Sequence, residues 1–228
     1  MPLSPQGWLT LAQYYEAEER DADAVRAYDR ALALDPTHVQ ARNNREKLLI
    51  KHALELGKPV TLTLGVNGPL TIDPDDATSY YQLGLRYLRN DEADLAVMAL
   101  RRAITLRPDL DEAHLFLGLA YTSVGTYASA EVEYLRAIAL RPTNPEAYNY
   151  LGLVYHQQQR YRQALQAYRQ AIAQAPEYAV AYVNLAASHE ALGQVDEALA
   201  AYRQALQHDA NLIALPEKID ALSKRVGR

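Results

Sequence analysis

The sequence predicts an all-α fold of stacked helical units, and three features of the chain support this prediction. Prolines recur every 34 residues in the middle of the chain, at Pro74, Pro108, Pro142 and Pro176. The same residue types recur around the last three prolines, and in each repeat the apolar residues form two stripes with helical spacing. A period of this length is typical of units that stack into an array and present an extended binding surface rather than a pocket.

Each repeat predicts a pair of helices, and five repeats can be aligned. They cover residues 5–38, 77–110, 111–144, 145–178 and 179–212. The first helix of each repeat carries a ring at its fourth position, leucine at the seventh, a small residue at the eighth and tyrosine or histidine at the eleventh. The small residues are Ala12, Gly84, Gly118, Gly152 and Ala186. We expect them to let the paired helices approach closely, while the rings fill the space between neighbouring helices.

The connections between the predicted helices carry residues suited to helix ends and turns. Proline lacks a backbone N–H, so it ends the second helix of a repeat. Asn144 precedes Pro145 and is expected to cap the helix that begins there. Gly125 and Gly193 stand between the two helices of their repeats, where the turn favours a left-handed backbone.

This set of residues resembles the tetratricopeptide repeat family over about three quarters of the chain. The resemblance implies a right-handed superhelix of stacked antiparallel helix pairs, which is an α-solenoid. It also implies that the first helix of each pair lines a concave groove, which in this family usually holds an extended peptide or a partner helix.

Residues 39–76 interrupt the period. Val39–Leu56 has the apolar spacing of a helix, but Arg45 and Glu46 stand where the repeats have leucine and a small residue. We interpret this helix as a degenerate repeat or a capping helix. A last helix from Pro216 is expected to cover the apolar end of the array. The chain then divides into an N-terminal repeat with an extra helix, a β-hairpin insertion, four consecutive repeats and a C-terminal capping helix, spanning residues 5–56, 57–76, 77–212 and 213–228.

Threonine and aliphatic residues alternate between residues 59 and 73, around Asn67-Gly68, and predict a β-hairpin with one apolar face. A three-residue loop at 66–68 would pair Leu64 with Leu70 and Leu62 with Ile72, and would keep the apolar residues on one side. Either the adjacent helices of the same chain cover this face, or the hairpin contacts a second subunit or enters a groove, because its edges can accept another strand. The possible oligomer contacts are Val60, Leu62, Leu64, Leu70 and Ile72.

Helical geometry places six positions of each first helix opposite its packing stripe. In the middle repeats these positions are unusually apolar for a face in water, with Phe116 at their centre. Amide side chains there could bond the backbone of a bound peptide. The alternatives are that curvature buries these residues, or that the hairpin, the N-terminal block or another copy covers them. The candidate partner-binding residues are Tyr81, Gln82, Leu85, Leu88, Arg89, Leu115, Phe116, Leu119, Asn149, Tyr150, Leu153, His156 and Asn184.

No residue pattern in the chain predicts catalysis, a metal site or a cofactor. The sequence has no His–acid–His spacing, nucleophile motif or glycine-rich phosphate loop. Some members of the resembled family bind C-terminal carboxylates through paired lysine, arginine and asparagine residues. Here the groove positions offer Arg89 but no lysine, and Glu112 and Glu146 would repel a carboxylate, so we do not expect that activity.

Composition narrows the classes of partner. The formal net charge of −5 gives no general attraction to nucleic acid or to an anionic membrane. The chain has no cysteine, which excludes disulfides. Neither a secretory signal nor a membrane-spanning apolar stretch is visible, so we expect a cytoplasmic protein that binds neither nucleic acid nor membrane.

These observations favour a non-catalytic scaffold or adaptor that binds an unidentified partner peptide or helix in an apolar concave groove. The alternative is a self-assembling structural protein whose groove or hairpin mediates homo-oligomerisation. An enzyme or a nucleic-acid-binding protein lacks any supporting pattern of residues.

Overall fold

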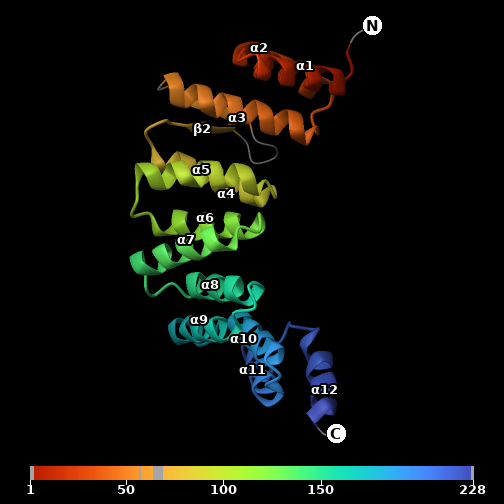
Figure 1. Ribbon diagram of the computed structural model, residues 1–228, viewed down its shortest axis with the longest axis vertical. Helices are drawn as coiled ribbons and strands as arrows, with labels where there is room; N and C mark the ends of the chain where they lie inside the picture. Colours follow the sequence, from red (N-terminus) through yellow and green to blue (C-terminus); the bar gives the residue numbers. More distant parts are fainter. Residues whose placement is uncertain (1–2, 57, 64–68, 227–228) are drawn as a thin grey trace. The chain divides into compact units, whose positions relative to one another are not determined.

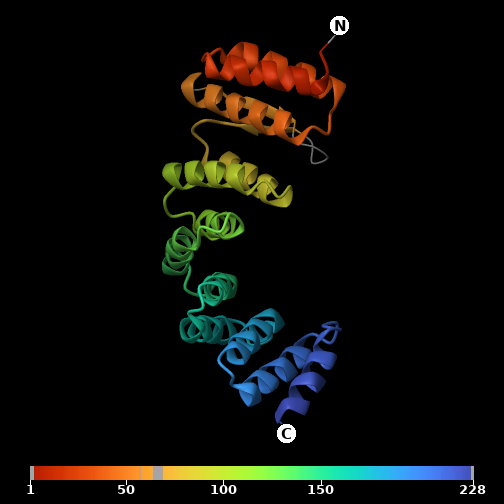
Figure 2. The same cartoon turned by 45° about the vertical axis from the view of Figure 1, so that its right-hand side comes forward.

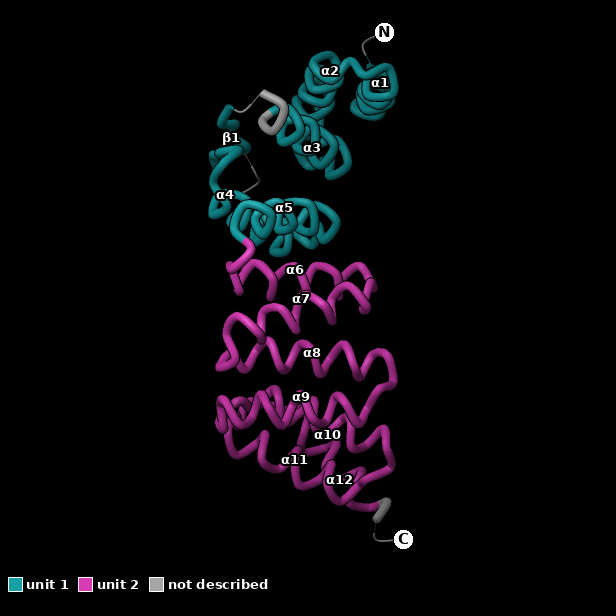
Figure 3. Tube along the Cα trace, turned by 60° about the vertical axis from the view of Figure 1, so that its left-hand side comes forward, with its two compact units in different colours: residues 1–107 teal, residues 108–228 magenta. Residues whose placement is uncertain are grey.

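The computed structural model describes residues 3–56, 58–63 and 69–226, which form helices throughout except for one short β-hairpin (Figures 1 and 2). The all-α prediction is therefore confirmed. The chain divides into two compact units, Met1–Arg107 and Pro108–Arg228, which Figure 3 colours separately. We call them unit 1 and unit 2.

Unit 1 contains two of the predicted helix pairs with the insertion between them. Its elements are α1 (Pro5–Ala17), α2 (Asp21–Leu34), α3 (Val39–Leu56), β1 (Val60–Thr63), β2 (Pro69–Ile72), α4 (Ala77–Arg89) and α5 (Ala93–Leu106). Unit 2 contains the other three pairs and a last single helix. Its elements are α6 (Asp111–Ser123), α7 (Tyr127–Leu140), α8 (Pro145–Gln157), α9 (Tyr161–Gln174), α10 (Ala179–Ala191), α11 (Val195–His208) and α12 (Leu215–Val226).

The small residue at the eighth position lets the two helices of a pair pack closely, as expected. A Cβ added to Gly118 would lie 2.6 Å from Cε1 of Tyr134, and one added to Gly152 would lie 2.5 Å from Cε1 of Tyr168. Both tyrosines are buried. In these two repeats the ring lies too close for a Cβ to fit without a shift, whereas the first and fifth repeats carry Ala12 and Ala186 at this position.

The predicted helix ends and turns are confirmed. The side chain of Asn144 accepts hydrogen bonds from the backbone N–H groups of Glu146 and Ala147, at 3.0 and 3.3 Å. Gly125 and Gly193 adopt φ values of 76° and 73° between the paired helices. That left-handed backbone is free of strain for glycine.

The insertion replaces the second helix that α3 would need to complete a repeat. α3 packs on α2 and on β1, while β2 packs on α4. Leu62 and Ile72 are completely buried within unit 1, so neighbouring helices of the same chain cover this face. The suggested contact of these two residues with a second subunit is therefore corrected: they are core residues. Val60 and Leu70 are partly buried, and Leu64 lies outside the described residues.

The strand register differs from the sequence prediction. Leu62 pairs with Leu70 and Val60 pairs with Ile72, so the predicted pairing of Leu62 with Ile72 is wrong. A shift of two residues leaves every side chain on the same face, and alternation alone cannot detect it. The observed pairing of Thr63 with Pro69 requires a connection longer than three residues. The predicted loop at 66–68 lies outside the described residues.

The junction between α3 and the α4–α5 pair is buried and polar. Arg42 pairs with Glu92 at 2.8 Å. Glu46 is 1% exposed, and neither of its carboxylate oxygens has a hydrogen-bond partner among the described residues. Burial raises the pKa of Glu46 to about 7, and the nearby charge of Glu92 adds to this effect. The Tyr87 hydroxyl and the Arg42 and Arg45 guanidinium groups act in the opposite direction on the pKa of Glu46.

The equivalent junction in unit 2 contains a paired acid. Arg160 at the start of α9 contacts both carboxylate oxygens of Glu131 on α7, at 2.6 and 3.1 Å. Its guanidinium also lies over the Tyr155 ring, 4.3 Å from the centroid. The hydrogen bonds from Arg160 hold the pKa of Glu131 below its usual value.

The C-terminal helix covers the end of unit 2, as expected. α12 packs on α11 and buries Leu215 and Leu222. Lys218 pairs with Glu190 of α10 at 3.0 Å, and its ammonium lies over the Tyr202 ring. The apolar contacts and the ion pair together fix α12 on the last repeat.

Candidate protein-binding surfaces

The helices of unit 2 form two layers. α8 contacts both α6 and α10, so these three first helices lie side by side, and α7, α9 and α11 each pack against their own partner. We call the surface of α6, α8 and α10 that faces away from α7, α9 and α11 the inner face. The exposed surface of α7, α9 and α11 is the outer face.

The inner face carries several of the apolar residues expected there. Phe116 and Leu119 of α6 and Tyr150 and Leu153 of α8 are each partly exposed. Tyr150 also stacks on Tyr134, with ring centroids 5.8 Å apart. These side chains therefore contribute to packing and leave part of their apolar surface in water.

Two residues predicted for this face are buried instead. Leu115 and Asn149 are each 3% exposed, and both occupy the fifth position of their repeat. Leu9, at the fifth position of the first repeat, is likewise buried. Leu115 and Asn149 are packed against neighbouring helices, so they hold the layer together and cannot offer an open binding surface.

The polar residues of this region bond across the layer. Asn184 of α10 donates a hydrogen bond to Asn149 of α8, with a nitrogen–oxygen distance of 2.9 Å. His156 Nδ1 lies 2.8 Å from Ser188 Oγ, and burial lowers the pKa of His156. These side chains first of all join α8 to α10. The suggested role of the Asn149 amide as a free partner for a peptide is therefore wrong.

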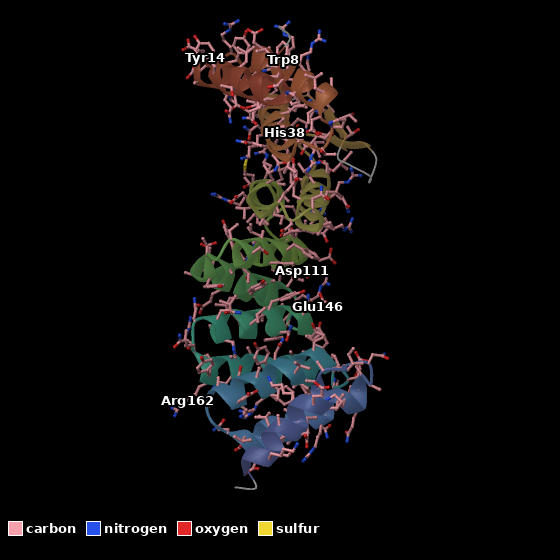
Figure 4. The ribbon with its side chains drawn as sticks, turned by 90° about the vertical axis from the view of Figure 1, so that its right-hand side faces the viewer. Trp8, Tyr14, His38, Asp111, Glu146 and Arg162 are labelled. Carbon is pink, nitrogen blue, oxygen red and sulfur yellow. The ribbon has the colours of Figure 1, made fainter. Side chains whose placement is uncertain are left out.

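The inner-layer helices of unit 2 have an acidic bias. α6, α8 and α10 contain Asp111, Glu112, Glu146 and Glu190 and no lysine or arginine. Arg141 pairs with Asp111 at 2.8 Å and lies 3.5 Å from Glu112, whereas Glu146 is exposed. Figure 4 shows Asp111 and Glu146 on one edge of unit 2 and Arg162 on the opposite edge. This distribution opposes the binding of an acidic segment on the inner face.

The remaining candidate residues lie on α4 in unit 1. Tyr81, Leu85 and Leu88 are partly exposed, and Gln82 and Arg89 are exposed. They share the helical face that corresponds to the inner face of unit 2. A single patch that joins them to the residues of unit 2 stays a prediction.

The structure also reveals apolar residues that the sequence analysis did not select. Val132 and Leu135 on α7 are 62% and 46% exposed, more than any candidate on the inner face of α6 or α8. The equivalent residues of α9 are Gln166 and Arg169. This contrast between the second helices of successive repeats is the sequence signal that identifies Val132 and Leu135.

Membrane and metal sites were also sought. Within the described ranges, no helix combines the length and apolar character needed to cross a membrane. The same residues contain no group of three or more histidine, aspartate or glutamate side chains placed to hold a metal ion.

Comparison with protein families matches well over half of the chain to repeat models. Tetratricopeptide repeat models match residues 5–48, 77–110, 145–178 and 179–212, and a TPR repeat model matches residues 118–159. No curated protein sequence matches the chain.

Several solved structures share the fold. A crystal structure of MamA has a TM-score of 0.57 to this chain at 23% sequence identity. The match covers 87% of this chain and 94% of the MamA chain. A thermophilic TPR protein from Thermus thermophilus has a TM-score of 0.57 at 19% sequence identity. That match covers 96% of this chain and 98% of the Thermus chain. The first TPR of Spaghetti (RPAP3), solved bound to an HSP90 peptide, has a TM-score of 0.50 at 21% sequence identity. That match covers 52% of this chain and 94% of the Spaghetti chain. At these identities the likeness describes the fold alone.

Proposed function

The chain belongs to the tetratricopeptide repeat family, and on that premise we propose that it is a non-catalytic scaffold that binds a segment of a partner protein on the inner face of unit 2. The observation that carries this proposal is the row of partly exposed apolar side chains on adjacent inner helices. Its members are Phe116, Leu119, Tyr150, Leu153 and Val183, with Val180 48% exposed.

The inner face suits an apolar segment because its large side chains are already held in place. Tyr150 is stacked on Tyr134, and the Asn149–Asn184 bond fixes α8 against α10. A surface ordered before binding loses little side-chain entropy when a ligand arrives. That a similar TPR structure was solved with a bound peptide supports this mode of binding for the fold.

The charges of the inner layer favour a neutral or basic ligand over an acidic one. Glu146 is exposed, and no lysine or arginine on α6, α8 or α10 opposes it. An acidic segment would bring like charges together at this edge, which costs affinity. The residues of α4 in unit 1, with Tyr81 and Leu85 at their centre, offer a second apolar face of the same kind.

Selection from a displayed library of random 12-residue peptides on the full chain tests this proposal. Peptides that bind the inner face should bind the double variant Phe116→Ser, Leu119→Ser at least tenfold more weakly, as measured by fluorescence anisotropy. The matched control is Val132→Ser, Leu135→Ser, which removes two apolar side chains from the outer face. Circular dichroism checks that both variants keep their helices.

Two results would contradict the proposal. One is that every selected peptide binds the Phe116→Ser, Leu119→Ser variant as tightly as the original chain. The other is a stable dimer in light scattering that the same substitutions convert to a monomer, because a second copy would then occupy the inner face. That second result would support self-assembly as the function.

A further inference from the structure

An exposed apolar ridge runs along α7 on the outer face of unit 2. Ala128, Val132, Leu135 and Ala139 are all exposed, and their spacing of four, three and four residues places them in one line along the helix. Val132 and Leu135 are 62% and 46% exposed. The ridge spans twelve residues, 128–139, and their eleven rises of 1.5 Å give a length of roughly 17 Å.

The other outer helices of unit 2 are polar along the same line. The equivalent residues are Arg162, Gln166, Arg169 and Ala173 on α9, and Asp196, Ala200, Arg203 and Gln207 on α11. Packing of the repeat therefore makes no demand for apolar residues here. A contiguous apolar ridge that the fold does not need is the usual mark of an interaction site.

A pocket lies between α8 and α9, the helix pair that follows α7. It has a volume of about 430 Å³, and its lining residues are Tyr148, Leu151, Tyr155, Gln163, Gln166, Ala167 and Gln170. Arg160 connects the two features, because it lies over the Tyr155 ring and pairs with Glu131, four residues before Leu135 on α7. The pocket combines apolar walls with amides that can both donate and accept hydrogen bonds.

The exposed charged side chains of α7 and α9 are all positive. Arg136 on α7 and Arg162 and Arg169 on α9 are exposed, and none of them forms an ion pair with a described residue. The nearby acids are engaged: Glu131 pairs with Arg160, and Glu133 lies 2.6 Å from His114. A ligand with carboxylates beside an apolar stripe would complement this surface.

We propose that the α7 ridge and the pocket between α8 and α9 bind an acidic amphipathic helix of a partner protein. The ridge is long enough for three turns of a helix, and its 4-3-4 spacing matches an apolar stripe on a facing helix. A second copy of this chain fits less well. Two ridges facing each other would bring together the same three arginines, and two large side chains offer far less than the roughly 800 Å² per partner of a stable dimer.

The test is selection on the full chain from a displayed library of amphipathic helices with randomised charged positions. Helices that bind the original chain are counter-selected against the variant Val132→Ser, Leu135→Ser, in which both changed residues are exposed. We expect survivors with a net negative charge, at least tenfold weaker binding to the serine variant, and a similar loss with Arg136→Glu, Arg162→Glu. Phe116→Ser, Leu119→Ser should leave their affinity unchanged.

Three outcomes would overturn the inference. Counter-selection could remove every helix, the survivors could be basic, or the inner-face substitutions could abolish binding as well. Light scattering over a dilution series measures whether the chain forms dimers. If the original chain dimerises and Val132→Ser, Leu135→Ser makes it monomeric, a second copy covers the ridge and the proposed partner class is wrong.

Discussion

The junction of α3 with α4–α5 in unit 1 and the junction of α7 with α8–α9 in unit 2 each place a glutamate against the tyrosine at the eleventh position of a repeat, but they carry opposite charges at its sixteenth position. In unit 2, Glu131 stands against Tyr155, and Arg160 at the sixteenth position neutralises it. In unit 1, Glu46 stands against Tyr87, and the sixteenth position is Glu92. Arg42 pairs with Glu92 and Arg45 pairs with Asp29, and neither carboxylate oxygen of Glu46 has a hydrogen-bond partner among the described residues.

This difference shows how an insertion changes the chemistry of a repeat. In α3, Glu46 occupies the eighth position, which is glycine or alanine in the repeats whose second helix packs against the first. A long side chain fits there because the hairpin follows α3 in place of a second helix. As a result, we expect packing of residues 5–56 onto α4–α5 to depend on protonation of Glu46, whose pKa is raised, whereas Glu131 in unit 2 is paired with Arg160.

The largest loss of stability should come from placing a glutamate, the residue that α3 has at its eighth position, at the eighth position of a regular repeat. Gly152→Glu would force a charged side chain against the buried Tyr168 ring and should destabilise unit 2 by about 4 kcal/mol or more. Ala173→Glu on the exposed side of α9 is the control and should cost less than about 0.5 kcal/mol. Urea denaturation followed by circular dichroism measures both, and equal stabilities of the two variants would refute the steric argument.

Glu46→Gln should make unit 1 more stable at high pH. The folded-state pKa of about 7 lies above the ordinary value of 4.5, so the folded state binds more protons in this window. Wild-type stability is therefore full below pH 4.5 and falls as the pH rises through about 7, by up to about 3 kcal/mol. The neutral glutamine should remove that dependence. Fluorescence of Trp8, the one tryptophan of the chain, reports unfolding of the N-terminal block.

Glu131→Gln is the matched control for this prediction, with the opposite sign. The pKa of Glu131 is lowered, so its contribution is present above the ordinary pKa and is lost as the pH falls. At neutral pH the Glu131 variant should lose stability while the Glu46 variant gains it. A loss of stability in both variants at pH 8 would contradict the comparison of the two junctions.

Arg160→Glu should give unit 2 the charge pattern of the junction between α3 and α4–α5, where the sixteenth position is a glutamate. The variant loses the contact with Glu131 and the cation–π contact with Tyr155, and it places two carboxylates together. Because the Arg160 side chain is 35% exposed, we expect a modest loss of about 1–2 kcal/mol at pH 7. Arg162→Glu, an exposed change two residues later, should stay within about 0.5 kcal/mol of the original chain in thermal unfolding.

The smallest effect is expected for Glu92→Gln. Removing this carboxylate takes away a charge that raises the pKa of Glu46, and it frees Arg42 to face Glu46 alone. The pH at which unit 1 loses stability should move downward, in the same Trp8 fluorescence experiment. An upward move would show that Arg42 acts on Glu46 only through Glu92.

The helix pairs could be predicted from the sequence because each repeat position has one recurring environment. Gly118 and Gly152 meet Tyr134 and Tyr168 at the same place, and Asn144 caps a helix through contacts with its next two or three residues. Such local and repeated relations can be read from residue types alone.

The sequence predictions were wrong where the burial of a residue depends on a neighbouring helix, or where the strand register depends on the length of a loop. A helical projection places Leu115 and Asn149 on the open face of their own helix, but a neighbouring inner helix covers the fifth position. The hairpin register depended on a connection whose length alternation does not constrain. Val132 and Leu135 are exposed because they lie on the side of α7 that faces away from its helix partners. The repeat pattern describes the packed side of that helix and does not predict what its exposed side carries.

Hydrogen–deuterium exchange of the full chain with a selected 12-residue peptide is the most direct test of the central claim, that the inner face of unit 2 binds partner segments. The account predicts slower exchange in α6, α8 and α10 and unchanged exchange in α1–α3. Slower exchange confined to unit 1, or none in α6, α8 and α10 at saturating peptide, would contradict it.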